Sequence, residues 1–85
     1  MPYSIQFKPA AFRELEKLPR ATQKRVAEKI ETLRDDPFPV GCKKLSGLPD
    51  ASRVRIGDYR IVYQVQRSIL LILVLAVGHR RELYR

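Results

Sequence analysis

DYRIVYQV (residues 58–65), SILLILVLAV (68–77) and GHRRELY (78–84) follow one another near the end of this 85-residue chain. The first two segments have the composition of β-strands, and the second is apolar after its first residue, as expected of a central strand covered on both faces. The third segment is cationic. This order predicts an apolar sheet beside groups that bind phosphate and transfer protons, such as Arg60 and His79. A basic site on a sheet indicates chemistry on RNA.

A further strand is predicted directly before this region. In RVRI (53–56) cations alternate with apolar residues, so the two arginines share one face and the apolar pair faces the core. The dipeptide Gly57-Asp58 is a turn signal and predicts an antiparallel hairpin. We therefore expect Arg60 to come close to Arg55.

The first part of the chain predicts one strand and two helices. Residues Tyr3–Phe7 alternate with period two, which is typical of a half-buried edge or joining strand. Pro9 suits the first turn of a helix, Pro19 interrupts that helix, and a second helix extends to Arg34. The expected apolar faces consist of Phe12, Leu15 and Leu18 in the first helix and of Val26, Ile30 and Leu33 in the second.

The segment between the second helix and the hairpin predicts a long surface loop. Residues 37–51 contain three prolines and two glycines and show neither a helical nor a strand period. Lys43 and Lys44 lie in this loop. The predicted class is α+β with the order β-α-α-β-β-β, in which a small, mostly antiparallel four-stranded sheet carries a helical hairpin on one face. A chain of this length forms one domain, spanning residues 1–85.

The charge of the chain favours a polyanionic partner. The formal net charge is +8 and the isoelectric point is about 10.2. Residues 1–42 carry a net charge of +2 and residues 43–85 a net charge of +6, so the C-terminal half is the expected binding half. Nucleic acid is the first candidate, because neutralised phosphates release counterions. A merely soluble basic surface is the alternative.

Several features place the chain in the cytoplasm. Cys42 is the only cysteine, so the chain can form neither an intrachain disulfide nor a zinc-binding cysteine pair. MPYSIQF (1–7) lacks the apolar core of a signal peptide, and the run Ile69–Val77 is shorter than the about 20 residues that a membrane-spanning helix needs. We expect a cytoplasmic protein that does not bind a membrane.

RNA can be cleaved by attack of its own 2′-OH, and this reaction sets the groups required. A base takes the proton, cations stabilise the charged transition state, and an acid protonates the departing 5′-oxygen. Arg60 and Arg80 suit the cationic role because guanidinium is permanently charged and offers a planar fork of donors. Asp58 and Glu82 are the only acids after Asp50, and two predicted strands separate them. We therefore expect cleavage without a metal ion or another cofactor.

KLSGLPDASRVRIGDYRIVYQV (44–65) and VGHRRELYR (77–85) resemble the RelE-type toxins of bacterial and archaeal toxin–antitoxin systems. The length, the basic charge and the order of elements agree with this family. The resemblance implies the toxin of a type II system, an endoribonuclease that enters the ribosomal A site, cuts messenger RNA there and inhibits translation. It also implies two partners, a small acidic RelB-like antitoxin and the ribosome with its messenger.

The resemblance also implies site residues. By motif position, the groups of the family that cut RNA fall on Arg53, Arg55, Arg60, Arg80 and Tyr84. Some relatives have lysines where this chain has the first two arginines. Arginine stays protonated and cannot serve as a base, so we expect these two residues to position phosphates.

The proton-transfer groups stay open between His79, Tyr84, Glu82 and the ribosome. An imidazole ordinarily titrates near pH 6.5, so a neutral His79 suits the role of base, although a lone histidine after a strand is commonly a surface residue. Tyr84 suits the role of acid, or its ring stacks on a nucleobase of the RNA. The remaining cations, which we expect to contact the RNA backbone or to be solvated on the surface, are Lys43, Lys44 and Arg81.

Two other functions fit the same residues. One is a toxin of the same superfamily that poisons DNA gyrase without cutting RNA; retention of Arg60, Arg80 and Tyr84 argues against it. The other is a non-enzymatic basic module in which the charges supply affinity alone.

Overall fold

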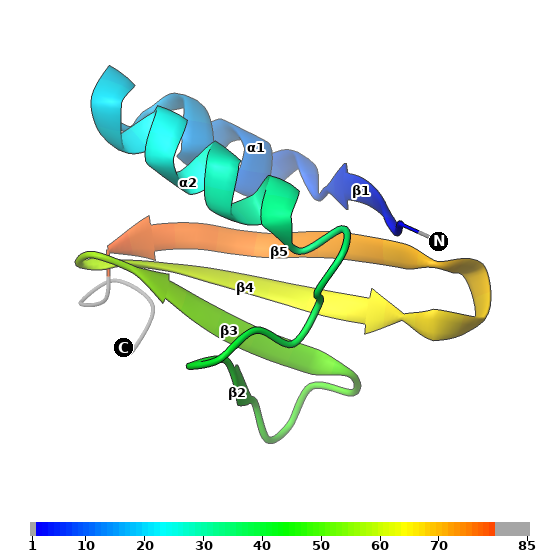
Figure 1. The fold of residues 1–85 in the computed structure, drawn as a ribbon. Coiled ribbons are helices and arrows are strands. Elements are labelled where there is room, and N and C mark those ends of the chain that lie inside the picture. Colours follow the sequence, from blue (N-terminus) through cyan, green and yellow to red (C-terminus); the bar gives the residue numbers. More distant parts are fainter. Residues whose placement is uncertain (1, 80–85) are drawn as a thin grey trace.

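The computed structural model describes residues 2–79, which form a five-stranded sheet with two helices on one face (Figure 1). The predicted α+β class and the helical hairpin are confirmed. None of the helices in this described part is long and apolar enough to cross a membrane. In chain order the elements are β1 (Ser4–Phe7), α1 (Pro9–Glu16), α2 (Arg20–Thr32), β2 (Lys43–Lys44), β3 (Ala51–Ile56), β4 (Tyr59–Gln66), the 3-10 turn η1 (Arg67–Ile69) and β5 (Leu71–His79).

The sheet has the order β1-β5-β4-β3-β2. β1 runs parallel to β5 at one edge, and every other neighbouring pair is antiparallel. The prediction of four strands was one short, because β2 forms inside the expected loop, where Lys43 pairs with Arg53 and Lys44 pairs with Ser52. A strand of two residues is too short to produce a period in the sequence. We call the side of the sheet under α1 and α2 the helix face and the opposite side the far face.

The helices begin near the predicted residues but present partly different faces. In α1 the buried residues are Ala11 and Leu15, one turn apart. Phe12 was expected in the core but is 47% exposed, and its ring meets the ring of Phe7 edge-on at 5.8 Å. The small Ala11 side chain lets the helix approach the sheet, so the wider Phe12 is turned to the rim. The buried face of the second helix follows the prediction, with Val26, Ile30 and Leu33 at most 2% exposed.

The hairpin between β3 and β4 follows the sequence prediction closely. Gly57 has a φ of 59°, a left-handed value that glycine adopts without strain. The register places Arg55 directly opposite Arg60. The apolar partners of these strands face the helices, and the buried core consists of Ala11, Leu15, Val26, Ile30, Leu33, Val54, Ile61, Tyr63, Val65, Ile72, Val74 and Val77.

β5 is a central strand, as predicted, but it is irregular. Tyr63 pairs with Val74 and Val62 pairs with Ala76, so Leu75 has no partner in β4, as in a β-bulge. The strand begins at Leu71, because Ile69 lies in η1 and is 63% exposed. The helices cover one of its faces (Figure 1), and on the other face Leu71, Leu73 and Ala76 are half-buried and Gly78 is buried.

The long connection after α2 crosses the helix face and is fixed there by Tyr63. The Tyr63 ring is fully buried, and its hydroxyl donates a hydrogen bond to the carbonyl oxygen of Pro37 at 2.7 Å. Burial raises the pKa of this phenol above its usual range, and the neighbouring Cys42 adds to the shift. The tyrosine therefore joins the central strand to a segment of chain that has no regular structure of its own.

Replacing Tyr63 with Phe tests this link. At pH 7 we expect Tyr63→Phe to lower the free energy of unfolding by about 1 kcal/mol, the usual net contribution of one hydrogen bond. The folded chain holds the phenol proton to a higher pH than the unfolded chain does, so wild-type stability from this group is present at neutral pH and falls above about pH 10. Tyr63→Phe has no phenol to ionise, so its free energy of unfolding should fall less between pH 7 and pH 10.5 than that of the wild type. Urea unfolding at pH 7 and pH 10.5 measures both effects.

Tyr3→Phe is the matched control, because the Tyr3 hydroxyl forms no hydrogen bond with the described residues. Equal unfolding curves for Tyr63→Phe and Tyr3→Phe at both pH values would contradict the role given to the Tyr63 hydroxyl.

Candidate nucleic-acid interface

Four cations gather on the far face of the sheet, across β2, β3 and β4. Lys43 lies opposite Arg53, and Arg55 lies opposite Arg60. Side chains two residues apart on a strand share a face, so these two pairs lie beside each other. Like charges directly opposite one another in a sheet are destabilising. We call these four residues the cationic cluster, and its composition suits an anionic ligand.

Arg60 occupies the central position of the cluster. It lies on β4, between β3 and β5, and is only 5% exposed. Its partner on β5 is Gly78, which carries no side chain and is itself buried. Glycine inside a strand often marks a place where a ligand approaches closely. Shielding from water strengthens the interaction of the Arg60 charge with an anion that reaches it.

A cavity of about 440 Å³ borders the cluster at the outer edge of β3. β2 pairs with Ser52 and Arg53, and among residues 2–79 no strand pairs with the outer edge of β3 beyond that point. The lining adds Lys29 of α2, which the sequence reasoning missed. No local pattern separates this lysine from the other cations of the helix, and only the tertiary packing brings it here. The cavity is lined by Lys29, Val40, Gly41, Lys43, Arg53, Val54 and Arg55.

His79 lies on the other side of the sheet from the cluster. It pairs with Tyr59, and the two rings meet edge-on with their centroids 5.6 Å apart. This pair borders a cavity of about 430 Å³ on the helix face, together with Glu14 of α1, Lys17 directly after that helix, and the adjoining turn. The structure therefore brings Arg53, Arg55 and Arg60 together but does not bring His79 to them.

The two lysines that were predicted in the loop lie on opposite faces of the sheet. Lys43 pairs with Arg53 and belongs to the cationic cluster, whereas Lys44 pairs with Ser52 and faces the helix side. Their prediction as loop residues was wrong because both lie in the edge strand β2. The remaining predicted site residues, Arg80, Arg81 and Tyr84, and the alternative proton-transfer residue Glu82, lie outside the described residues.

Glu14 fixes the end of β5 that adjoins Arg60. β1 ends opposite Val74, and three residues farther along β5 the backbone N–H of Val77 donates to Oε1 of Glu14 at 3.2 Å. Val77 is 1% exposed, so this N–H has little access to water. The Glu14 carboxylate thus accepts a backbone hydrogen bond from β5 beyond the point where the neighbouring β1 has ended. Glu14 lies outside the apolar face expected for the first helix, and sequence reasoning missed the contact.

Comparison with known proteins gives a consistent result. The chain matches the family model described as ParE toxin of type II toxin–antitoxin system, parDE, over residues 5–84. It is 35% identical over 84 residues to a putative RelE-like toxin protein of Escherichia coli, covering 96% of this chain and 87% of that protein. It is 29% identical to the mRNA interferase toxin RelE of Escherichia coli K12, with the same coverage. The solved toxin–antitoxin complex RelBE2 of Mycobacterium tuberculosis contains a chain with a TM-score of 0.82 and 30% identity, covering 94% of this chain and 100% of that one.

The contact between Glu14 and Val77 can be tested by substitution. Glu14→Ala leaves the buried N–H of Val77 without its acceptor, and we expect a loss of about 1–3 kcal/mol in the free energy of unfolding. Glu14→Gln keeps an acceptor oxygen and recovers most of that loss. Chemical denaturation measures both, with Glu16→Ala as the control for removing an exposed carboxylate from the same helix. Equal losses for Glu14→Ala and Glu16→Ala would contradict this role.

Proposed function

This chain belongs to the RelE/ParE family of toxins from type II toxin–antitoxin systems, and we propose that it is a ribosome-dependent endoribonuclease that cuts messenger RNA in the ribosomal A site. The observation that carries this proposal is the cationic cluster of Lys43, Arg53, Arg55 and Arg60. A relative of similar length is named an mRNA interferase, which supports the same reaction.

In the proposed reaction the 2′-oxygen attacks the adjacent phosphorus and the bond to the 5′-oxygen breaks. The products are a 2′,3′-cyclic phosphate and a 5′-hydroxyl. Negative charge builds up on the phosphate oxygens in the transition state, and we assign Arg60 and Arg80 to stabilise it. Arg53 and Arg55 hold the flanking phosphates, since a guanidinium forks onto two phosphate oxygens at once. Lys43 and Arg81 add backbone contacts.

The described part of the cluster contains cations only, so it supplies charge stabilisation but no proton acceptor. His79 packs on Tyr59 across the sheet from Arg60. We therefore assign proton transfer first to Tyr84, to Glu82 or to groups of the ribosome, ahead of His79.

We propose that the reaction proceeds without a metal ion or cofactor. Four clustered cations disfavour a divalent metal at the scissile phosphate by charge repulsion. Residues 2–79 also contain no group of three or more His, Cys, Asp or Glu side chains placed to hold a metal ion. Cleavage that persists in EDTA supports this part of the proposal.

The proposed partners are the ribosome, with its messenger in the A site, and a RelB-like antitoxin. The structural relative RelBE2 was solved as a toxin–antitoxin complex, which supports an antitoxin for this chain. A small acidic antitoxin would neutralise the cationic cluster and block its access to RNA. We therefore also propose that the protein acts in the cytoplasm, where ribosomes are found.

A second candidate function follows from the ParE description of the matching family model. A gyrase-directed toxin would share the fold and would not cut RNA. Primer extension on a messenger in programmed ribosomes, with and without EDTA and beside the same RNA without ribosomes, distinguishes these functions. Cleavage only on ribosomes supports the endoribonuclease. Folded protein that cuts in neither sample favours the gyrase-directed toxin, or a non-enzymatic nucleic-acid-binding module if DNA supercoiling is also unaffected.

Substitution of Arg60 tests the proposed charge stabilisation. We expect Arg60→Ala to slow single-turnover cleavage on ribosomes by about 10²-fold or more, because it removes donors aimed at the transition state. Arg60→Lys keeps the positive charge but loses the forked pair of N–H donors, so its cleavage rate should lie between those of the alanine variant and the wild type. Arg13→Ala, which removes an exposed cation of α1, is the control and should retain the wild-type rate. Near-normal rates for both folded Arg60 variants would remove this residue from the site.

The position of His79 gives a separate prediction for the pH dependence. A histidine that acts as the general base must be deprotonated, so the rate would rise with pH as it loses its proton, and its replacement would abolish that rise. Because His79 lies across the sheet from Arg60, we expect His79→Gln to leave the shape of the pH–rate profile unchanged. Loss of an acidic limb in the variant would instead identify His79 as the base.

A further inference from the structure

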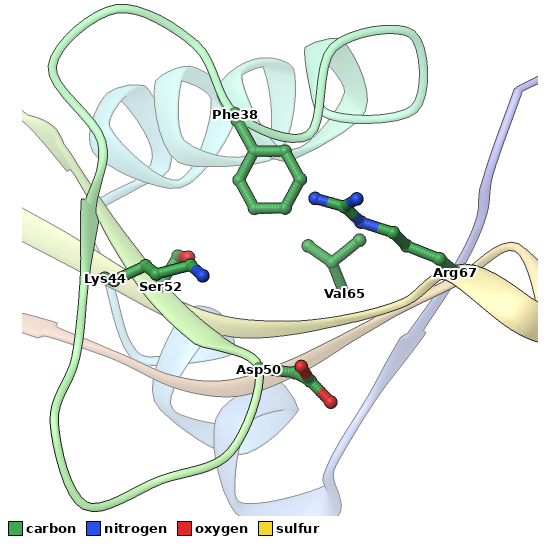
Figure 2. Close-up of a pocket in the computed structure, with 6 residues that line it drawn as sticks. All are labelled: Phe38, Lys44, Asp50, Ser52, Val65 and Arg67. Carbon is green, nitrogen blue, oxygen red and sulfur yellow. The ribbon is translucent and has the colours of Figure 1, made fainter.

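A separate cavity of about 360 Å³ lies on the helix face of the sheet, beside the end of β4. Its volume falls within the range of small-ligand sites. The lining comes from parts of the chain that are distant in sequence: the connection after α2, β2, the turn before β3, β3 itself, β4 and η1. Figure 2 shows the six lining residues, which are Phe38, Lys44, Asp50, Ser52, Val65 and Arg67.

One wall of this cavity is formed by a cation–π contact between a guanidinium and an aromatic ring. The central carbon of the Arg67 guanidinium lies 5.0 Å from the centroid of the Phe38 ring. Phe38 is 36% exposed, although a large apolar ring is usually buried. Exposed aromatic rings and guanidinium planes are the surfaces on which proteins stack unpaired RNA bases. Val65, which is 4% exposed, provides a fixed apolar floor.

Polar groups surround this wall. Lys44 is directed to this face by the alternation of β2, away from the cationic cluster to which Lys43 belongs. Ser52 is 1% exposed, so its position is fixed by the packing around it. Asp50 has a φ of 58°, a left-handed value that is uncommon outside glycine, and its carbonyl oxygen accepts the N–H of Val65 at 3.1 Å. Figure 2 shows Asp50 across the cavity from Phe38.

We propose that this cavity binds one unpaired nucleotide of ribosomal RNA. The base stacks on the Phe38 and Arg67 wall, Lys44 binds the phosphate, and the Asp50 carboxylate accepts N–H groups from the edge of the base. An acidic peptide fits less well, because it would leave the stacking wall unused. The inference rests on the proposed function in naming the ribosome as the source of the nucleotide.

This site would give the toxin contacts with RNA on both faces of its sheet. The cationic cluster takes the messenger on the far face, and the Phe38 cavity takes a nucleotide of the surrounding ribosome on the helix face. A contact of this kind holds the protein in place and leaves the chemical step to the cluster. Its loss therefore weakens binding to ribosomes without slowing cleavage once ribosomes are saturating.

The first test uses adenosine 5′-monophosphate as the probe and follows backbone amide shifts of the full chain by NMR. We expect the largest shifts at Ser52, Val65 and Arg67. Phe38→Ala should weaken this binding at least about fivefold, from the stacking energies of bases on aromatic residues. Leu48→Ala is the control, because Leu48 is 48% exposed on a nearby loop and does not line the cavity. Arg67→Gln serves as a second, independent variant if Phe38→Ala does not fold.

The second test measures the affinity of the slow-cleaving Arg60→Ala protein for programmed ribosomes. Adding Phe38→Ala should weaken binding at least about fivefold, while adding Leu48→Ala should leave it within about twofold. Nucleotide shifts confined to the cationic cluster, or equal ribosome affinity for the Phe38 and Leu48 variants, would overturn the inference. Binding of a glutamate-rich peptide at the cavity without binding of the nucleotide would also overturn it, in favour of a protein partner.

The two tests separate this inference from the proposed function. Nucleotide binding at the Phe38 cavity that Phe38→Ala removes, in a protein that cuts no RNA, supports the cavity and counts against the nuclease. Cleavage on ribosomes by a protein whose cavity binds no nucleotide supports the nuclease and counts against the cavity.

Discussion

The register between β3 and β4 is the constraint on which both proposed RNA-binding surfaces depend. Burial of Val54, Ile61 and Tyr63 under the helices fixes this register, because a slip of one residue would exchange the two faces of a strand. Once the apolar residues face the core, Arg55 and Arg60 must lie together on the far face. The same hydrophobic burial that stabilises the sheet therefore assembles the cationic cluster, and no separate interaction between the arginines is needed to bring them together.

The paired cations of the cluster lower the stability of the fold, although they are the residues proposed to bind RNA. The core is small, and the sheet above it carries Arg55 directly opposite Arg60, with Lys43 opposite Arg53. Like charges in these positions repel one another, and an anion bound between them relieves the repulsion. Any acidic partner that binds the folded chain then stabilises it by mass action.

Much of the fold could be predicted from the sequence, because its signals are local and repeated. The alternation in RVRI and the Gly57-Asp58 turn gave the hairpin and its register, and with them the neighbouring positions of Arg55 and Arg60. Two other features could not be predicted. β2 is held only by its pairing with β3, and its two residues carry no period of their own. The side on which His79 lies depends on the unpaired Leu75, since uninterrupted alternation from Val74 would have placed it with the arginines.

The unpaired Leu75 also affects how homologous chains should be aligned. A bulge accommodates one extra residue without turning the following side chains to the other face, so a relative that lacks this residue would still present the same groups on each face. The number of residues between Arg60 and Gly78 is therefore not fixed by the three-dimensional site. A one-residue gap in this strand is compatible with an unchanged site, and motif searches with rigid spacing would miss members of the family that differ only there.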